Sequence, residues 1–299
     1  MIKRLVSLGS VIVDLVLEVP KLPNRGGDVL ATQRGIAAGG AFNVLSAASR
    51  LGLHSAYAGS HGTGPMSDLV RASLTREGID VMQAPNPDLD TGWTIALIEP
   101  DGERTFVTVT GADGLIDPAA LAALQYEDGD AVYVSGYDLA YPAAGASIAH
   151  HLAGLQPGVT VVLDPGPLAA DIPKEILATV MRRAGILSLN EREAKALGSV
   201  TLDSKTTTVI ERRGPGGATI HRAGKTPELI PAAPVAAVVD TSGAGDVHVG
   251  AMVAGLARGL DLSGAVLLAN RAAGYAVSRR GPAAGPTDAQ LDVFSAGRW

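Results

Sequence analysis

Apolar residues along the chain gather in two kinds of segment that alternate with one another. Short runs rich in Val, Ile and Leu are typical of buried strands, whereas longer segments rich in Ala and Leu are typical of helices. We predict strands at residues 4–9, 55–60, 131–136, 159–165, 186–190 and 207–214, and helices at 41–52, 66–78, 175–185 and 245–259. The last two helices are expected to end at a glycine, as helices often do. The alternation predicts βαβ units, a largely parallel central sheet and an α/β fold.

Two regions depart from this alternation. The first, residues 15–35, contains Pro20, Pro23 and paired glycines between short extended pieces. The second, residues 91–111, has two alternating strands on either side of a Pro-Asp-Gly-Glu turn, which is typical of a hairpin. Because a hairpin pairs poorly with a central parallel sheet, we expect both regions to form one small sheet outside the main body. A pair of ordinary edge hairpins is the alternative.

The composition is that of a globular protein with a large core. The chain has 299 residues, of which 46% are hydrophobic and 18% charged, enough for one large α/β domain or two smaller ones. It has no cysteine, which excludes disulfides and thiolate sites and suits the cytoplasm, where we expect the protein to be. A net charge of −6, without a basic run longer than two residues, disfavours nucleic-acid binding. No apolar stretch reaches the roughly 18 residues of a membrane span.

The segment DTSGAGDVHVGAM, residues 240–252, places small residues before an acid at the start of a predicted helix. The backbone N–H groups of Gly243, Ala244 and Gly245, together with the helix dipole, can form an anion hole for a phosphoryl group. Asp246 can then accept the proton of a hydroxyl that attacks this group. The alternative is that Asp246 is only a helix cap or a first-turn acid.

A second glycine cluster precedes the predicted helix at 41–52. Gly39 and Gly40 allow a substrate to approach the backbone, and Asn43 in the first turn offers a donor and an acceptor to a polyol. Asp14, just after the first strand, can accept hydrogen bonds from two neighbouring sugar hydroxyls. A tight loop with a capping Asn and an exposed strand-end acid are the corresponding alternatives.

Two further segments suggest contacts with a metal–phosphate. Asn190 and Glu193 would face the same side of a first helical turn, where they could order water around the metal; a capping pair is the alternative. The turn after Arg212 and Arg213 is rich in glycine, which fits a phosphate contact and a plain hairpin turn equally. His248, on the last predicted helix, is expected to pack rather than to catalyse. The chain has no GxxxxGK[ST] motif, which excludes a P-loop enzyme, and no GxGxxG after the first strand, which disfavours a dinucleotide-binding fold.

Taken together and in order, these segments resemble the ribokinase-like carbohydrate kinases, the PfkB family, and the resemblance covers nearly the whole chain. Residues 240–253 match the C-terminal signature of this family. The N-terminal signature is matched at Gly39, Gly40, Ala41, Asn43, Gly52 and Gly62. It departs at Leu45, where the family usually has a small residue. The segments DPGP at 164, NEREA at 190 and RRGPGG at 212 follow in the family's order.

The resemblance implies a role for each group of candidate residues. In the chemical step, Asp246 is the catalytic base, and the anion hole consists of Gly243, Ala244 and Gly245. The sugar-binding residues are Asp14, Gly39, Gly40 and Asn43. The residues of the ATP site are Asn190, Glu193, Arg212, Gly214, Gly217 and Asn270, although the family usually has a hydroxyl residue near Arg212. The expected cation sites are Glu193, which would hold Mg2+ through water, and Asp240 with Ser242, where many members bind a monovalent cation such as K+.

The fold that the resemblance implies is a three-layer ribokinase-like sandwich with a central mostly parallel sheet and a small β-sheet lid. We expect the α/β domain, which would bind nucleotide and substrate, at residues 1–11, 37–90 and 112–299, and the lid at 12–36 and 91–111. In the family, such a lid closes over the sugar and often mediates homodimerisation. Closure also keeps water from the γ-phosphate.

The expected activity is transfer of the γ-phosphoryl group of ATP, with Mg2+, to a hydroxyl of a small sugar or polyol. A nucleoside or pseudouridine-type kinase of the same fold is the first alternative, and it would need an aromatic platform for the base, for which Trp93 is a candidate. A phosphosugar kinase is less favoured because no basic cluster surrounds the sugar-binding residues, although Arg25, Arg34 and Arg104 lie in the lid. From a different class, a non-catalytic sugar-binding protein is disfavoured by the intact Gly-Ala-Gly-Asp segment.

Overall fold

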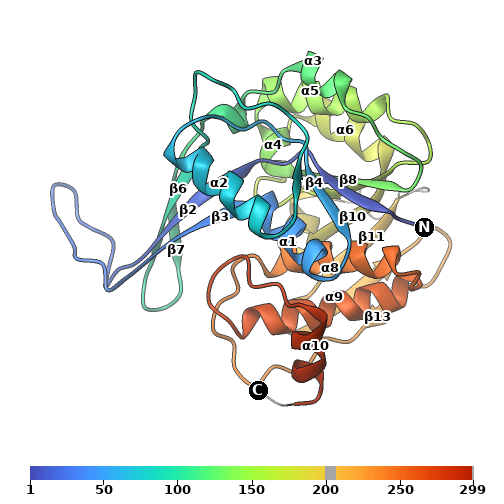
Figure 1. The fold of residues 1–299 in the computed structure, drawn as a ribbon. Coiled ribbons are helices and arrows are strands. Elements are labelled where there is room, and N and C mark those ends of the chain that lie inside the picture. The colour runs from blue at the N-terminus through green and yellow to red at the C-terminus, as the bar shows by residue number, and fades with distance from the viewer. Residues whose placement is uncertain (199–206, 298–299) are drawn as a thin grey trace.

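The structure is a computed structural model that describes residues 1–198 and 207–297, and its strands form two separate sheets (Figure 1). The larger sheet has nine strands in the order β13-β12-β11-β10-β9-β8-β1-β4-β5. These strands are β1 (Arg4–Ser7), β4 (His54–Tyr57), β5 (Asp80–Val81), β8 (Asp130–Ser135), β9 (Thr160–Asp164), β10 (Ala184–Asn190), β11 (Thr208–Arg212), β12 (Ala218–His221) and β13 (Glu228–Ile230). Neighbours are parallel except for β11–β12 and β12–β13, so the prediction of a mostly parallel central sheet is confirmed.

Helices cover both faces of this sheet and give the main body three layers (Figure 1). One face carries α1 (Ala41–Arg50), α2 (Pro65–Arg76), α8 (Ala244–Ala257), α9 (Leu262–Val277) and α10 (Asp288–Ser295). The other carries α3 (Pro118–Ala123), α4 (Gly136–Ala140), α5 (Pro142–Ala153), α6 (Lys174–Arg183) and α7 (Glu191–Leu197). Successive strand residues enter different cores: Leu5 and Val162 face the first set of helices, and Val6 and Val161 the second. Burial of both faces explains why the strands are continuous apolar runs.

The predicted elements of the main body are present in the described residues. The six predicted strands correspond to β1, β4, β8, β9, β10 and β11, and the four helices to α1, α2, α6 and α8. Gly259 follows α8 with φ +81°, as expected for a glycine at a helix C-terminus. The same expectation for α6 is wrong, because α6 ends at Arg183 and β10 starts at the next residue, which places Gly185 in a strand. None of the helices in residues 1–198 and 207–297 has both the length and the apolar character needed to cross a bilayer.

The smaller sheet stands away from the main body, on the left in Figure 1. Its four strands, in spatial order, are β3 (Gln33–Gly40), β2 (Val11–Glu18), β6 (Trp93–Ile98) and β7 (Arg104–Val109). β6 and β7 form the expected antiparallel hairpin, with Gly102 at φ +86° in its turn, and β2 pairs with β6 in parallel. The two regions that break the alternation therefore form one small sheet, as predicted, and not two separate edge hairpins.

The two faces of this small sheet carry different side chains. Asp14 lies opposite Thr94, which lies opposite Thr108, and the two Thr hydroxyls are 2.9 Å apart, so these residues share one face. Side chains of neighbouring residues point to opposite faces of a strand. The next row, Ile36, Leu15, Ile95 and Val107, therefore lies on the other face and is entirely apolar. We call these the Asp14 face and the outer face.

Candidate active site

The carboxyl ends of the central strands gather polar side chains at one edge of the large sheet. Asp164 ends β9, Asn190 ends β10 and Arg212 ends β11. The N-terminus of α8 comes to the same place, because a side-chain carbon at Gly245 would lie 3.3 Å from the guanidinium carbon of Arg212. Ligands of open parallel sheets bind at this edge, so the topology alone makes it the candidate site.

Among the described residues, no side chain caps the start of helix α8. Its N-cap, Gly243, has φ +66°, and a side chain there would overlap the carbonyl oxygen of Pro282. The first N–H groups of a helix have no partner within the helix, and they favour an anion. Asp246 lies in the first turn and is not the N-cap, so of the two alternatives for this residue the structure excludes the helix cap and leaves the first-turn acid.

The Asp246 carboxylate is held by a residue from the other glycine segment. Asn43 of α1 donates from Nδ2 to Asp246 Oδ2 at 2.9 Å, although the two residues are 203 positions apart. Burial raises the pKa of Asp246 to about 7; the hydrogen bond from Asn43 opposes this rise, and the charge of Asp164 adds to it. A carboxylate that titrates near neutral pH is suited to general-base catalysis.

The predicted sugar-binding residues lie around this carboxylate. Asn43 Oδ1 is buried and has no hydrogen-bond partner among the described residues. Burial raises the pKa of Asp14 to about 6, and the charge of Asp14 in turn raises the pKa of Asp246. Gly39 and Gly40 lie at the end of β3 and not in a loop, since α1 starts at the next residue. A side chain at Gly39 would overlap the Asp14 carboxylate, which explains the glycine there.

Arg212 is buried among acids. It donates to Asp164 Oδ2 at 2.5 Å, to Ser188 Oγ at 3.0 Å and to Glu193 Oε2 at 3.2 Å, and 13% of its side chain is exposed. Burial lowers its pKa, but the charges of Asp164 and Glu193 outweigh this effect and hold the pKa above its usual value. Arg212 is thus a fixed positive charge beside the N-terminus of α8.

Asn190 and Glu193 form a complete capping box at the start of α7. Asn190 Oδ1 accepts from the N–H groups of Arg192 and Glu193, while the Glu193 carboxylate accepts from the Asn190 N–H and from Nδ2, both at 2.7 Å. The alternative that Asn190 and Glu193 are a capping pair is therefore confirmed. Both Glu193 oxygens accept hydrogen bonds from Asn190, which fixes the orientation of this carboxylate.

Carboxylates outnumber cations in this part of the site. Burial, and then the charges of four carboxylates, raise the pKa of the Tyr137 hydroxyl to about 12. These four are Asp246, Asp14, Asp164 and Glu193. A phosphate that approached them would be repelled unless a cation came with it. A nucleotide bound with Mg2+ meets this requirement, so the residues present fit a metal–phosphate complex.

Asp240, expected with Ser242 to bind a monovalent cation, is paired with the guanidinium of Arg104. Asp240 Oδ1 accepts from the Ser242 N–H at 2.9 Å and from Arg104 Nη2 at 2.8 Å, and Asp240 Oδ2 accepts from the Gly281 N–H at 3.0 Å. Burial raises the pKa of Asp240, but these hydrogen bonds and the Arg104 charge bring it below its usual value. The guanidinium neutralises this carboxylate, so the residues do not fit a second cation at the same oxygen atoms.

Asn270, expected in the nucleotide site, is tied into the main body. Its Nδ2 donates to the carbonyl oxygens of Ile230 and Pro231 at 3.1 and 2.9 Å, which leaves Oδ1 to accept from His248 Nε2 at 3.1 Å. His248 is buried, and burial lowers its pKa to about 3, so the ring is neutral with its proton on Nε2. His248 therefore packs between α8 and α9, as expected from the sequence.

The glycine-rich turn after Arg213 joins β11 to β12 as a hairpin. The Arg213 N–H donates to the Gly217 carbonyl at 2.8 Å. Gly217 has φ +85°, and a side chain there would overlap the Ile230 carbonyl, whereas Gly214, with φ +53°, has open space around it. Turn geometry accounts for both glycines, and at Gly214 it also leaves room for a ligand.

The aromatic side chains near the site differ from the one that the sequence suggested. Trp93 neighbours Thr94 and so lies on the outer face, partly buried against the main core, where it cannot stack on a base. Phe106 lies on the Asp14 face and is 58% exposed, and Tyr137 at the start of α4 is 49% exposed. Sequence reasoning missed both, because an aromatic residue within a strand or helix is first interpreted as core.

Comparison with known proteins decides the family. A model described as "pfkB family carbohydrate kinase" matches residues 2–289. The chain belongs to the pfkB family of carbohydrate kinases. The resemblance inferred from the two glycine signatures is confirmed, and the enzyme class is that of an ATP-dependent sugar kinase, a phosphotransferase.

Relatives of this pfkB kinase match along nearly their whole length. The uncharacterized sugar kinase YegV of Escherichia coli (strain K12) is 37% identical over 298 residues, which cover 95% of this chain and 91% of the relative. The ATP-dependent ribose-1-phosphate kinase of Halopiger xanaduensis is 28% identical over 313 residues, 99% of each chain. The structure of Burkholderia thailandensis nucleoside kinase in complex with inosine has a TM-score of 0.81 at 22% identity, covering 98% of this chain and 96% of that one. The three-layer fold with a small second sheet is therefore that of the ribokinase-like kinases.

Proposed function

We propose that the protein transfers the γ-phosphoryl group of ATP to a hydroxyl of a small sugar or polyol, with Asp246 as catalytic base and the N-terminus of α8, Gly243 to Gly245, as the anion hole. One observation carries the proposal: the Asp246 carboxylate lies beside an uncapped helix end, is held by Asn43 and has its pKa raised to about 7. An acid next to an anion site is useful when the anion must meet a hydroxyl that loses its proton.

We assign the acceptor to the space between Asp14, Asn43 and Asp246. Asn43 Oδ1 is a buried acceptor without a partner in the described part of the chain, and it would take a hydrogen bond from a substrate hydroxyl. The Asp14 carboxylate accepts from two further hydroxyls. Gly39 and Gly40 keep side chains out of this space. An acceptor rich in hydroxyl groups satisfies these oxygens.

We assign the nucleotide to the carboxyl ends of β10 and β11. Glu193 would hold Mg2+ through water, with Asn190 fixing the orientation of its carboxylate through the capping box. Arg212 keeps Asp164 and Glu193 in place, and Gly214 leaves open space for the nucleotide. When bound, Mg2+ supplies positive charge that screens the phosphates from the carboxylates of the site.

The residues of this chain then divide the chemical step between them. Asp246, in its ionised form, accepts the proton of the attacking hydroxyl, and the amide of Asn43 keeps its carboxylate in position. The N–H groups at Gly243 to Gly245 hold the oxygens of the transferred phosphoryl group, where negative charge develops. The small sheet, over the acceptor, excludes water that would otherwise take the phosphoryl group.

The test is ADP release by the purified protein over a panel of pentoses, hexoses, polyols, sugar 1-phosphates and nucleosides. We expect turnover with a sugar or polyol, and a loss of about 10²- to 10⁴-fold in kcat for Asp246→Asn, the typical contribution of a general base. ATP binding and the melting temperature should not fall in this variant. Turnover retained by Asp246→Asn would contradict the assignment of the base. Sugar binding without ADP release would instead indicate the non-catalytic binding protein.

A nucleoside acceptor is the second candidate, because one observation favours it. Phe106 is 58% exposed on the Asp14 face, and Tyr137 is 49% exposed near Asp14 and Asp246, so two aromatic rings are available to stack on a base. The relative of known structure that binds inosine shares the fold. If the acceptor is a nucleoside, Phe106→Ala should raise its KM and leave kcat largely unchanged. Equal KM values for the variant and the wild type would remove this candidate.

We further propose that the outer face of the small sheet pairs with that of a second copy. Ile36, Val107 and Val109 are 57%, 56% and 42% exposed on this face, beside the partly buried Leu15 and Ile95. A continuous apolar patch of this kind is uncommon on a monomer. Size-exclusion chromatography with light scattering should show a dimer that Val107→Asp converts to a monomer. A wild-type monomer at micromolar concentration would contradict the proposal.

A further inference from the structure

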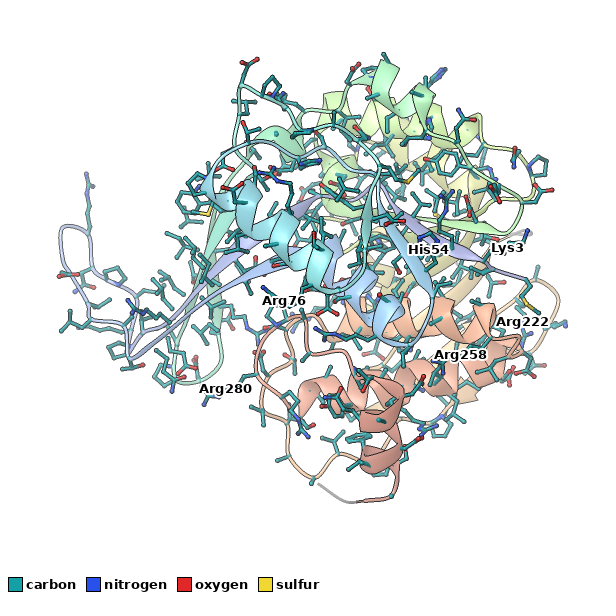
Figure 2. The ribbon with its side chains drawn as sticks, viewed as in Figure 1. Lys3, His54, Arg76, Arg222, Arg258 and Arg280 are labelled. Atoms are coloured by element: carbon teal, nitrogen blue, oxygen red, sulfur yellow. The ribbon has the colours of Figure 1, made fainter. Side chains whose placement is uncertain are left out.

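One row of residues across the small sheet carries its contacts with loops of the main body. Gln33, Glu18, Ile98 and Arg104 lie directly opposite one another across β3, β2, β6 and β7. Glu18 and Gln33 accept hydrogen bonds from Arg280 at 2.8 and 2.6 Å. Figure 2 shows Arg280 at the lower end of the small sheet, on the side of the main body. The polar side chains of this row therefore fasten the small sheet to the main body.

The fourth residue of this row, Arg104, reaches the loop that leads into α8. Arg104 Nη2 donates to Asp240 Oδ1, and the side chains of the pair are 27% and 17% exposed, so the contact is largely shielded from water. Asp240 is also bonded to the N–H groups of Ser242 and Gly281. Three residues after Asp240, Gly243 is packed against the Pro282 carbonyl. Asp240 thus joins the two backbone segments that shape the start of α8, and Arg104 is paired with this carboxylate.

The position of this guanidinium bears on the cation expected at Asp240. A monovalent cation bound there would need the same carboxylate oxygen atoms and would lie within a few ångströms of Arg104. Two positive charges at about 4 Å repel each other by several kcal/mol at the effective dielectric constant of a partly buried site. Arg104 of the small sheet therefore supplies, at the Asp240 carboxylate, the positive charge that a monovalent cation would otherwise supply.

We propose that Arg104 is a positioning residue for phosphoryl transfer: carried on the small sheet, its guanidinium pairs with Asp240 in place of a monovalent cation and completes the anion hole only when the sheet is docked. This inference rests on the proposed kinase function and deepens it. Docking of the sheet over the acceptor and the shaping of the anion hole then become one event.

The kinetic test compares the wild type with Arg104→Gln and Arg104→Lys in potassium chloride and in tetramethylammonium chloride at equal ionic strength. The wild type should have the same kcat in both salts. Arg104→Gln should lose about tenfold or more in kcat in tetramethylammonium chloride, as misplaced catalytic groups do, and recover part of it with K+. Arg104→Lys, which keeps the charge, should retain most of the rate without K+.

Two control variants separate positioning from simple attachment of the small sheet. Arg280→Gln removes the contacts of Arg280 with Glu18 and Gln33 but leaves Asp240 paired, so it should raise the KM of the acceptor without creating a response to K+. Arg34→Gln alters an exposed arginine on the outer face and should behave as the wild type. A wild type that needs K+, or an Arg104→Gln variant with unchanged kcat, would overturn the inference.

A measurement that does not need turnover keeps this test independent of the proposed function. The melting temperature of the wild type should be the same in the two salts, whereas Arg104→Gln should be stabilised by K+ relative to tetramethylammonium, because its Asp240 carboxylate can then bind the ion. A K+-specific stabilisation of the wild type would overturn the inference even if no acceptor is found. Failure of every acceptor in the panel, by contrast, would count against the kinase function alone.

Discussion

The pH dependence of kcat/KM should report the ionisation of Asp246. A base must be ionised to accept a proton, and burial raises the pKa of this carboxyl to about 7, where an ordinary Asp would have ionised about three pH units lower. Its ionised fraction is about one half at pH 7 and about one tenth at pH 6, so kcat/KM should fall about fivefold between pH 7 and pH 6 and about tenfold for each pH unit below 6. Above pH 8 it should be constant.

Replacement of Asn43 should move this acidic limb in a defined direction. Asn43 Nδ2 donates to the charged form of Asp246 and so lowers its pKa. A hydrogen bond to a charged group contributes about 1.5–3 kcal/mol, or about one to two pH units at 1.36 kcal/mol per unit. Because water can take part of the place of the amide, Asn43→Ala should move the midpoint upward by about one pH unit.

The assay is initial-rate ADP formation at saturating Mg-ATP and low acceptor concentration, from pH 5 to 9 in a buffer of constant ionic strength. Asn24→Ala, in an exposed loop of the small sheet, is the matched control and should keep the wild-type midpoint. Asn43→Ala also weakens acceptor binding, but this lowers the whole curve without moving its midpoint. A wild-type midpoint between pH 4 and 5, or a midpoint unmoved in Asn43→Ala, would refute the reasoning.

Two further predictions concern stability, measured by urea unfolding. Arg212→Leu leaves the buried Asp164 and Glu193 without their cation and should lower the free energy of unfolding by about 3–5 kcal/mol. The neighbouring variant Arg213→Leu breaks only an exposed ion pair with Glu191 and should lower it by less than about 1 kcal/mol. His248→Phe leaves Asn270 Oδ1 without a donor and should cost about 1–3 kcal/mol at pH 7.5. In the folded wild type the pKa of His248 is about 3, whereas in the unfolded chain it is 6.5. Between pH 7.5 and pH 5 only the unfolded wild type therefore gains a proton, which lowers the free energy of unfolding of the wild type and not that of His248→Phe. The difference in the free energy of unfolding between the two proteins should thus be about 2 kcal/mol smaller at pH 5 than at pH 7.5.

The fold could be predicted from local patterns because its elements follow local rules. A parallel strand buried on both faces is a continuous apolar run, and the segment 131–136 indeed lies in β8, Asp130–Ser135. The turn at Asp101 and Gly102 predicts the hairpin by the same kind of rule. Gly185 shows the limit: a glycine after a helix usually ends it, but here β10 begins at once and the glycine belongs to the strand.

The contacts that complete the site could not be predicted in this way. Arg104 and Asp240 are 136 positions apart, and each lies in a segment with a sufficient local explanation, a strand of a hairpin and a loop before a helix. Arg212 shows the same limit, since the turn after it suggested a phosphate contact while its partners Asp164 and Ser188 come from two other strands. Only the order of strands in the sheet brings these groups together, and no local pattern contains that order.

Local rules nevertheless help to separate functional groups from structural ones once the fold is known. Asn190 and Glu193 satisfy each other in a capping box, so their arrangement would be stable without any ligand. Asp246 is different: it caps nothing, and folding leaves it beside an uncapped helix end and next to Asn43, whose Oδ1 has no partner in the described residues. A buried acceptor without a donor costs about 1–3 kcal/mol, and a carboxylate with a raised pKa also opposes folding at neutral pH. Such costs persist where a ligand removes them, which supports the proposed acceptor site between Asp14, Asn43 and Asp246.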